Sequence, residues 1–289
     1  MSCLIGLIGS DIGTSLSPAL HEAEARHHGL CLCYRVIDLD EIAGGAGAIG
    51  DLVGWARRLG FDGLNVTHPC KAAVIPFLDE LSEEAETLGA VNTVVFDRGR
   101  AIGHNTDGIG FAEGFVRGLP GGATGRVVQL GAGGAGAAVA HALLARGAGE
   151  LTVVDVEPAR ATALAAELTR RFGTGRAHGA APPDLGALLA ASDGLVHATP
   201  TGMSHSPGMP LPPEILHPGL WVADIVYRPV ETELLRHARR IGCRTLNGTG
   251  MLVFQAVHAF RLFTGVPPDA DRMFAHMTEL VTAQAALRT

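Results

Sequence analysis

A glycine-rich turn between two apolar segments constrains the fold of this chain more than any other feature. The segment 126–130 is followed by Gly131-Ala132-Gly133-Gly134-Ala135-Gly136, an alanine-rich run, and a second apolar segment, 151–154. This order predicts strand, turn, helix and strand. The three glycines of the G-x-G-x-x-G pattern, Gly131, Gly133 and Gly136, suit a tight turn, the approach of a pyrophosphate, and close packing of helix on strand. The sequence therefore predicts a dinucleotide site at the N-terminus of the helix, where anions bind.

The second of these strands ends in Asp155, close to the distance at which a dinucleotide fold places a carboxylate on the adenosine ribose. Its charge would repel a 2′-phosphate, which favours NAD over NADP. Arg160, in the helix that follows, favours the opposite choice if it pairs with a 2′-phosphate. NAD is the cofactor we expect, and NADP stays open as the alternative.

The composition narrows the class of protein. With 289 residues, 47% of them hydrophobic and 18% charged, the chain has the length for two domains and the composition of a soluble globular protein. No apolar run reaches the ~20 residues of a membrane span. The net charge of −7 is spread along the chain, which argues against nucleic acid as a partner. Thirteen histidines show no ligand spacing, so we expect no metal site.

The five cysteines are odd in number and irregularly spaced, which indicates reduced thiols and a cytoplasmic protein. Cys31 and Cys33 alternate along an apolar segment, and we expect them to be buried. The sequence leaves the oligomeric state open, a homodimer included.

Strands and helices alternate in the first hundred residues, which predicts a mostly parallel sheet with a ligand crevice at the carboxyl ends of its strands. Thr67 and Lys71 fall at such an end, after the strand 63–67. Ser15 and Ser17 precede a helix, and they either cap it or hold a polyhydroxylated ligand; we favour the cap, at Ser17. The expected strands are 3–9, 34–39, 63–67 and 90–95, and the expected helices are 18–28, 50–59 and 82–88.

Three further polar residues allow two interpretations each. A lone lysine such as Lys71 is usually a solvated charge, but at the carboxyl end of a strand it can also face the ligand crevice. Asn92 interrupts an apolar strand and either satisfies local backbone or faces the crevice. Asp107 is either the cap of the following helix or a functional carboxylate. Because Lys71, Asn92 and Asp107 occur together, one after another along the chain, we favour the functional interpretation for all three.

Several motifs follow one another along the chain: Asn65-Val66-Thr67-His68-Pro69-Cys70-Lys71, Gly89-Ala90-Val91-Asn92-Thr93, His104-Asn105-Thr106-Asp107-Gly108, the glycine turn, Asp224-Ile225-Val226-Tyr227-Arg228-Pro229 and Gly250-Met251-Leu252-Val253-Phe254-Gln255. In content, order and spacing they resemble the shikimate dehydrogenase family, over nearly the whole chain. Within that family, Asp155 and the segment 259–265 resemble the NAD-using quinate/shikimate dehydrogenases of actinobacteria.

The resemblance implies an α/β fold of two domains. Residues 1–106 and 249–289 would form a substrate-binding and catalytic domain, to which the C-terminal helices return, and residues 107–248 a Rossmann-type NAD(P)-binding domain. It implies reversible hydride transfer between shikimate and 3-dehydroshikimate, with quinate as a further substrate. Ser15-Leu16-Ser17 argues against quinate, because quinate-active members often carry a threonine at the second hydroxyl position.

The resemblance also implies a role for individual residues. Lys71 and Asp107 match the catalytic pair, with Lys71 as the base that takes the hydroxyl proton in oxidation. The substrate-binding residues would be Ser15, Ser17, Thr67, Asn92, Tyr227 and Gln255. The cofactor-binding residues would be Gly131, Gly133, Gly134, Ala135, Gly136, Asp155, Arg160, Thr199, Pro200, Thr201, Gly202, Met203, Ile225 and Gly248.

Two alternatives to a shikimate dehydrogenase stay open. One is an aminoshikimate or aminoquinate dehydrogenase, because exchange of a hydroxyl for an amine changes only one or two pocket contacts. The other is a dinucleotide-sensing regulator without turnover, against which the presence of both Lys71 and Asp107 argues.

Overall fold

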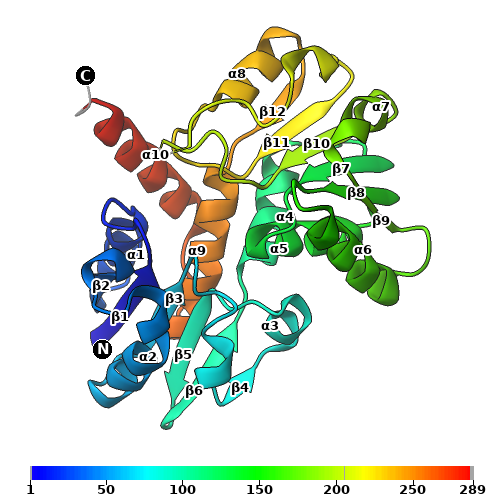
Figure 1. Ribbon diagram of the computed structural model, residues 1–289. Helices are drawn as coiled ribbons and strands as arrows, with labels where there is room; N and C mark the ends of the chain where they lie inside the picture. The colour runs from blue at the N-terminus through cyan, green and yellow to red at the C-terminus, as the bar shows by residue number, and fades with distance from the viewer. Residues whose placement is uncertain (1, 205, 287–289) are drawn as a thin grey trace. The chain divides into compact units, whose positions relative to one another are not determined.

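The computed structural model describes residues 2–204 and 206–286, which divide into two compact units (Figure 1). The first unit joins the residues up to Thr106 with those from Gln255 onward, and the second is the continuous segment Asp107–Phe254. The helix α9 (Thr249–Thr264) contains the second crossing of the chain between the units. No helix of residues 2–204 and 206–286 is long and apolar enough to cross a membrane.

The first unit is built on a six-stranded sheet of order β2-β1-β3-β5-β6-β4. β1 pairs in parallel with β2 and β3, while β5 runs antiparallel to both β3 and β6. The carboxyl ends of β1 and β3 therefore lie at the same edge. The strands are β1 (Ser2–Gly9), β2 (Cys31–Asp38), β3 (Gly63–Val66), β4 (Glu80–Leu81), β5 (Thr93–Asp97) and β6 (Arg100–His104).

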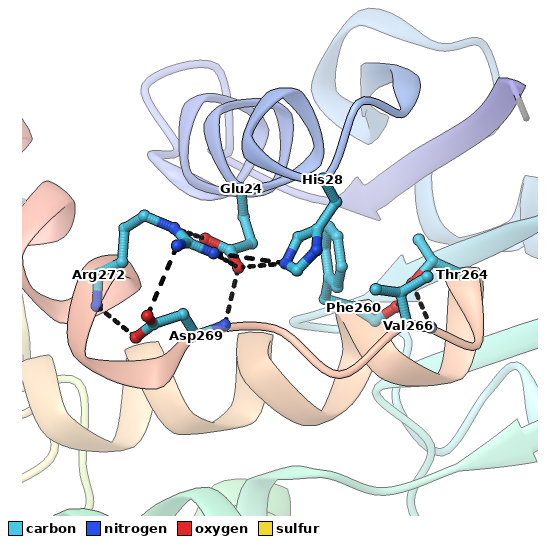
Figure 2. Close-up of polar contacts among 7 residues, drawn as sticks. All are labelled: Glu24, His28, Phe260, Thr264, Val266, Asp269 and Arg272. Carbon is cyan, nitrogen blue, oxygen red and sulfur yellow. Dashed lines mark hydrogen bonds and ion pairs between the residues drawn. The ribbon is translucent and has the colours of Figure 1, made fainter.

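Helices cover both faces of this sheet. One face packs on α2 (Ile49–Arg58) and α3 (Glu83–Leu88), whose apolar side chains join Leu64, Val66 and Val94 of the strands in one core. On the other face, Ala259 and Phe263 of α9 pack on Ile5, Leu7 and Tyr34. The helix α1 (Ser17–His27) contributes His21 beside Tyr34 and is held to α10 (Ala270–Ala286) by the polar contacts of Figure 2.

The second unit is built on an all-parallel sheet of order β12-β11-β10-β7-β8-β9. Counted within the unit and read from the opposite edge, this order is 3-2-1-4-5-6, that of a Rossmann fold. The carboxyl ends of all six strands share one edge, and the order reverses between β7 and β10. The strands are β7 (Arg126–Leu130), β8 (Glu150–Val154), β9 (Ala177–Ala180), β10 (Gly194–His197), β11 (Trp221–Asp224) and β12 (Arg244–Leu246).

This sheet is also covered on both faces, as Figure 1 shows. The helices α4 (Asp107–Gly118), α5 (Gly134–Ala145) and α6 (Pro158–Phe172) share one core with the sheet, in which Val139, Leu143 and Leu144 are buried as predicted. The helices α7 (Leu185–Ala190) and α8 (Glu233–Arg240) share the other. The predicted α/β class with a Rossmann-type unit is confirmed.

Several local predictions differ from the structure. Cys31 and Cys33 are exposed, which contradicts the prediction that they are buried. β2 is an edge strand, and its inward positions are taken by the alternate residues Leu32, Tyr34 and Val36. The segment Gly45–Ala48 forms a 3-10 turn, which was not predicted. The strands β4, β6 and β9 were not predicted.

Candidate active site

The glycine turn after β7 has the geometry that a dinucleotide requires. Gly131 has φ +101°, and a Cβ atom there would lie 2.4 Å from the carbonyl oxygen of Ala198. A Cβ at Gly136 would lie 2.4 Å from the carbonyl oxygen of Gly131. Within the described residues, nothing lies within 4 Å of a Cβ built on Gly133 or Gly134. Packing thus requires glycine at the two outer positions, while open space faces the middle of the turn, at the start of α5.

Gln129, near the end of β7, supports the glycine turn and was not predicted from the sequence. Its side chain is fully buried, and its Nε2 donates hydrogen bonds of 2.8 Å to the carbonyl oxygens of both Gly131 and Gly136. The signal in the sequence was a single amide in the otherwise apolar end of β7. This amide ties the beginning of the turn to the first turn of the helix.

Asp155, one residue past β8, also supports the turn. Its Oδ2 accepts a hydrogen bond from the backbone N–H of Ala132 at 2.8 Å, and its Oδ1 accepts one from Glu157 at 2.9 Å. The residue is only 9% exposed. Arg160 is exposed, and its Nε lies 3.5 Å from a carboxylate oxygen of Glu157. A negative charge is thus fixed at this edge, and the nearby positive charge is already partly balanced.

The other predicted cofactor residues follow the strands on the opposite side of β7. The turn Thr199–Met203 comes after β10, and Ile225 comes directly after β11. A Cβ at Gly248 would lie 2.2 Å from the carbonyl oxygen of Ile225, so close packing requires glycine there. The order of the sheet places all these segments along one carboxyl edge. Two buried residues at this edge, His197 and Asp224, were not singled out from the sequence.

In the first unit, the loop after β1 is fixed by acidic side chains of β2 and the residues after it. Asp38 Oδ2 accepts hydrogen bonds from the backbone of Ile12 and Gly13 at 3.0 and 3.1 Å. The helix α1 begins at Ser17, and Leu16 occupies the cap position without a side-chain hydrogen bond. The prediction that Ser17 caps this helix is wrong, because Ser17 already lies in its first turn. Ser15 and Ser17 are half-buried, and Ser15 Oγ accepts the Ser17 N–H at 3.3 Å.

Backbone hydrogen bonds connect this loop with the segment that carries Thr67 and Lys71. The N–H of Ser10 donates to the carbonyl of His68 at 2.9 Å, and the N–H of Val91 donates to the carbonyl of Lys71 at 2.7 Å. Thr67 and Lys71 are both half-buried. The loop between β1 and α1, residues 10–16, is called the serine loop below. It therefore meets the Thr67–Lys71 segment and the segment before Asn92 at one edge of the first sheet.

Asn92 lies just before β5 and is 4% exposed. Its Nδ2 donates to Thr106 Oγ1 at 2.9 Å, and its Oδ1 accepts from the N–H of Thr106 at 2.9 Å. These bonds tie the amide to Thr106, the residue before α4. Asn65 of β3 supports it, because Asn65 Nδ2 donates to the carbonyl of Asn92 at 3.2 Å. Asn65 in turn accepts from the Tyr34 hydroxyl at 2.6 Å.

The remaining predicted residues lie on other elements. Asp107 is the first residue of α4 and is 5% exposed. Gln255 lies on α9 and is half-buried. Tyr227 follows β11 and is half-buried; burial raises the pKa of its phenol, which the nearby Arg228 lowers to a smaller extent. Lys71 and Gln255 belong to the first unit, whereas Asp107 and Tyr227 belong to the second.

Family models match three parts of the chain. One described as the shikimate dehydrogenase substrate binding domain matches residues 7–94, and one described as the shikimate 5′-dehydrogenase C-terminal domain matches residues 248–273. Between them, a model described as the saccharopine dehydrogenase NADP binding domain matches residues 127–207.

Individual proteins match over nearly the full length. A shikimate dehydrogenase (NADP(+)) of Streptomyces avermitilis is 65% identical over 98% of both chains. A quinate/shikimate dehydrogenase (NAD(+)) of Corynebacterium efficiens is 50% identical over 96% of this chain and 99% of its own. A solved structure of quinate dehydrogenase from Corynebacterium glutamicum in complex with NAD superposes with a TM-score of 0.90 at 47% identity, covering 96% of this chain and 99% of the other.

These relatives match nearly the whole chain, both units included. They confirm the family that the sequence motifs predicted. The chain belongs to the shikimate dehydrogenase family, whose members are NAD(P)-dependent oxidoreductases.

Proposed function

We propose that this protein catalyses reversible hydride transfer between shikimate and 3-dehydroshikimate, with NAD(P) as the second substrate. The observation that carries the proposal is the 65% identity, over 98% of both chains, to a relative named shikimate dehydrogenase. The glycine turn supports it, since Gly131 and Gly136 are required by packing and the middle of the turn is open. These residues fit a bound dinucleotide.

The two units divide the work in this proposal. The first unit, which a substrate-binding family model matches at residues 7–94, binds the substrate. The second unit has the Rossmann strand order and binds the dinucleotide along its carboxyl edge. The proposed ligands of the shikimate carboxylate and hydroxyls are Ser15, Ser17, Thr67, Asn92 and Gln255 of the first unit, together with Tyr227 of the second.

Lys71 and Asp107 are the proposed catalytic pair. Oxidation of a secondary alcohol requires a base for the hydroxyl proton and an acceptor for the hydride, and bound NAD(P) supplies the acceptor. Lys71 takes the proton in oxidation and returns it to the ketone oxygen in reduction. Asp107, buried at the start of α4, orients the lysine and the hydroxyl. The backbone of Lys71 is fixed by its hydrogen bond with Val91, which limits the positions that the ammonium reaches.

NAD is the proposed preferred dinucleotide. The Asp155 carboxylate is fixed by two backbone N–H groups, so it cannot swing away from a 2′-phosphate without loss of both bonds. Arg160 could favour NADP, but its guanidinium is exposed and lies beside Glu157. The relatives named above differ in the dinucleotide of their names, NADP(+) in one and NAD(+) in the other.

Shikimate is proposed over quinate because Ser17 occupies the second hydroxyl position of the first loop. The cytoplasm is the proposed compartment, since all five cysteines are free.

Steady-state kinetics test these proposals together. The protein is assayed with shikimate, quinate and their amino analogues, each with NAD and NADP, by absorbance of the reduced nicotinamide. We expect shikimate with NAD to give the highest kcat/KM. A higher kcat/KM for an amino analogue would transfer the assignment to the secondary-pathway alternative, and no turnover with any pair would support the regulator.

A lysine variant tests the proposed mechanism. Lys71→Ala should reduce kcat by at least about a hundredfold, the lower end of general acid–base contributions, while shikimate binding stays measurable by calorimetry. Lys71→Arg serves as a control that keeps the charge but makes a poor base. A Lys71→Ala enzyme with near-normal kcat would exclude Lys71 as the base.

A further inference from the structure

A buried chain of polar side chains lies at the carboxyl edge of the second sheet. His197, the last residue of β10, and Asp224, the last residue of β11, are 0% and 1% exposed. His197 Nδ1 lies 2.9 Å from Asp224 Oδ1, and His197 Nε2 lies 2.5 Å from Thr199 Oγ1. Asp224 Oδ2 accepts from the Thr232 hydroxyl at 2.7 Å. The chain thus runs from Thr199 through His197 and Asp224 to Thr232.

These bonds use both nitrogens of the His197 ring. Since an ionised carboxylate only accepts, Nδ1 donates to Asp224. Nε2 forms the hydrogen bond to the Thr199 hydroxyl. Thr199 Oγ1 accepts in turn from the N–H of Thr201 at 3.3 Å, and Asp224 Oδ1 accepts from the N–H of Val226 at 2.9 Å. These hydrogen bonds together fix the turn after β10 and the backbone after β11.

The position of this chain in the sheet indicates which half of a dinucleotide it serves. The pyrophosphate faces the glycine turn after β7, and Asp155 after β8 marks the adenosine side. β10 and β11 lie on the other side of β7, beyond the point where the strand order reverses. The nicotinamide half must therefore lie over the ends of β10 and β11, where Thr199 and Ile225 are half-buried at the edge.

An apolar pair would fill these positions without the cost of desolvating a carboxylate and an imidazole, and such replacements are often neutral or stabilising. A need for orientation is a physical reason to keep the polar pair. We propose that His197, held by Asp224, is a positioning residue that fixes Thr199 and the turn Thr199–Gly202 for the nicotinamide half of the dinucleotide. This inference rests on the proposed function for the side of the sheet on which the dinucleotide binds.

Two variants break the chain at different points. His197→Asn keeps a donor for Asp224, but its side chain is too short to reach Thr199. Thr199→Val keeps the shape of residue 199 and removes its hydroxyl. For each, calorimetry with NAD⁺ and NADP⁺ should show a dissociation constant raised about tenfold for the dinucleotide that the wild type binds more tightly, the size expected for one lost hydrogen bond. The dissociation constant of ADP-ribose, which lacks the nicotinamide, should stay within about twofold of wild type.

The double variant tests whether His197 acts through Thr199. If it does, His197→Asn with Thr199→Val should weaken dinucleotide binding no more than the stronger single variant does. In the enzyme assay, kcat should fall and the KM for the dinucleotide should rise, while the KM for shikimate stays the same.

His217 offers a matched control in the same unit. It precedes β11, at the opposite end of the strand from Asp224, and both ring nitrogens are hydrogen-bonded, to Leu189 and Gly219. His217→Asn should leave the affinities for both ligands unchanged. Equal weakening of ADP-ribose and dinucleotide, unchanged dinucleotide affinity, or additive losses in the double variant would each overturn the proposal. Because the test measures binding, it gives a result even if the wild type does not oxidise shikimate, an outcome that would reject the proposed function alone.

Discussion

Asp155 combines two duties at one residue, support of the glycine turn and selection of the dinucleotide. Its two carboxylate oxygens accept the N–H groups of Ala132 and Glu157, and its charge lies where an adenosine ribose is expected. Asp155→Asn keeps an acceptor but removes the charge. We expect the ratio of kcat/KM for NADP to that for NAD to rise by about tenfold, because repulsion of the 2′-phosphate is relieved.

Arg160→Ala provides the opposite change, since its guanidinium is the cation nearest in sequence to this edge. It should lower the same ratio. Asp155→Asn also removes one support of the turn, so both kcat/KM values should fall while the ratio rises. A ratio that does not move in Asp155→Asn would show that the carboxylate is only a support of the turn.

His21 is a buried titratable residue outside the proposed chemistry. It is 1% exposed, its ring lies 5.2 Å from that of Tyr34, and neither ring nitrogen has a hydrogen-bond partner within residues 2–204 and 206–286. Burial lowers its pKa from 6.5 to about 4. Between these values the unfolded chain binds a proton that the folded protein does not, so stability is lost as the pH falls through this window.

The loss attributable to His21 should be about 3 kcal/mol between pH 6.5 and pH 4, since each unit of pKa shift corresponds to about 1.4 kcal/mol. His21→Leu removes the titrating group, and urea unfolding at several pH values should show a shallower decline in the free energy of unfolding than in wild type. His27→Gln, an exposed change on the same helix, is the control. Parallel pH profiles for wild type and His21→Leu would contradict this account.

At the scale of elements, an ion pair between the buried Glu24 and the half-buried Arg272 connects α1 with α10 (Figure 2). Arg272 donates from Nε and Nη2 to the two carboxylate oxygens of Glu24, at 2.8 and 2.6 Å. Glu24 also accepts the backbone N–H of Asp269 at 2.7 Å and is 2% exposed. Burial raises the pKa of Glu24, but the bonds from Arg272, Asp269 and His28 outweigh it, and the net pKa is lowered.

Removal of Arg272 should therefore leave a buried carboxylate with too few partners. Arg272→Met is expected to lower the free energy of unfolding by about 3 kcal/mol, and the double variant with Glu24→Leu should recover most of it, because no uncompensated charge then remains. The exposed pair Arg100 and Glu80 supplies the control, since Arg100→Met should cost less than about 1 kcal/mol. Urea unfolding of the four proteins gives the comparison, and a large loss in the double variant would contradict it.

The stability contributed by this pair also depends on pH, but for a different reason. The partners of Glu24 favour its charged form, whereas burial disfavours the charged form of His21. The folded pKa of Glu24 is lowered, so its contribution is present above the unfolded value of 4.5 and is lost as the pH falls through the lower folded value.

How well elements could be predicted depended on whether their signal was local. The helix α6, expected after Asp155, has its boundary signals in its own sequence, because Pro158 begins it and Gly173 follows it. The strand β9, Ala177-His178-Gly179-Ala180, has no strand-like composition and exists because it pairs with β8 at the sheet edge. The exposure of Cys31 and Cys33 likewise follows from the edge position of β2, which is a property of the sheet and not of the segment.

At the scale of the whole molecule, the glycine turn, the two-unit organisation and the family could be predicted from motifs that are short and continuous. The polar residues that support those motifs could not. Gln129, Asn65 and the pair of His197 and Asp224 are single polar residues in apolar strands, and their partners lie on other elements. Their contribution depends on which strands become neighbours, which composition and periodicity do not specify.

If the substrate and the dinucleotide bind to the segments proposed above, each ligand should protect different backbone amides from hydrogen exchange. Hydrogen exchange of the full chain would be followed by mass spectrometry with shikimate alone and with ADP-ribose alone. Ligand binding stabilises the structure around its own site, so each ligand should slow exchange chiefly in the segments that bind it. With shikimate we expect slowing in segments 12–17, 67–71 and 90–93, and with ADP-ribose in segments 131–137 and 155–160.

The same experiment separates the two halves of the dinucleotide. NAD should add protection at 199–203 and 225–227 that ADP-ribose does not give, because those segments follow the strands on the nicotinamide side of β7. The C-terminal part of α6, near Phe172, lies far from the carboxyl edge and gives the internal reference. Its rate of hydrogen exchange should not change with any ligand. Protection of the glycine turn by shikimate alone, or of the serine loop by ADP-ribose alone, would show that the units do not bind their ligands separately and would require the assignment of roles to be revised.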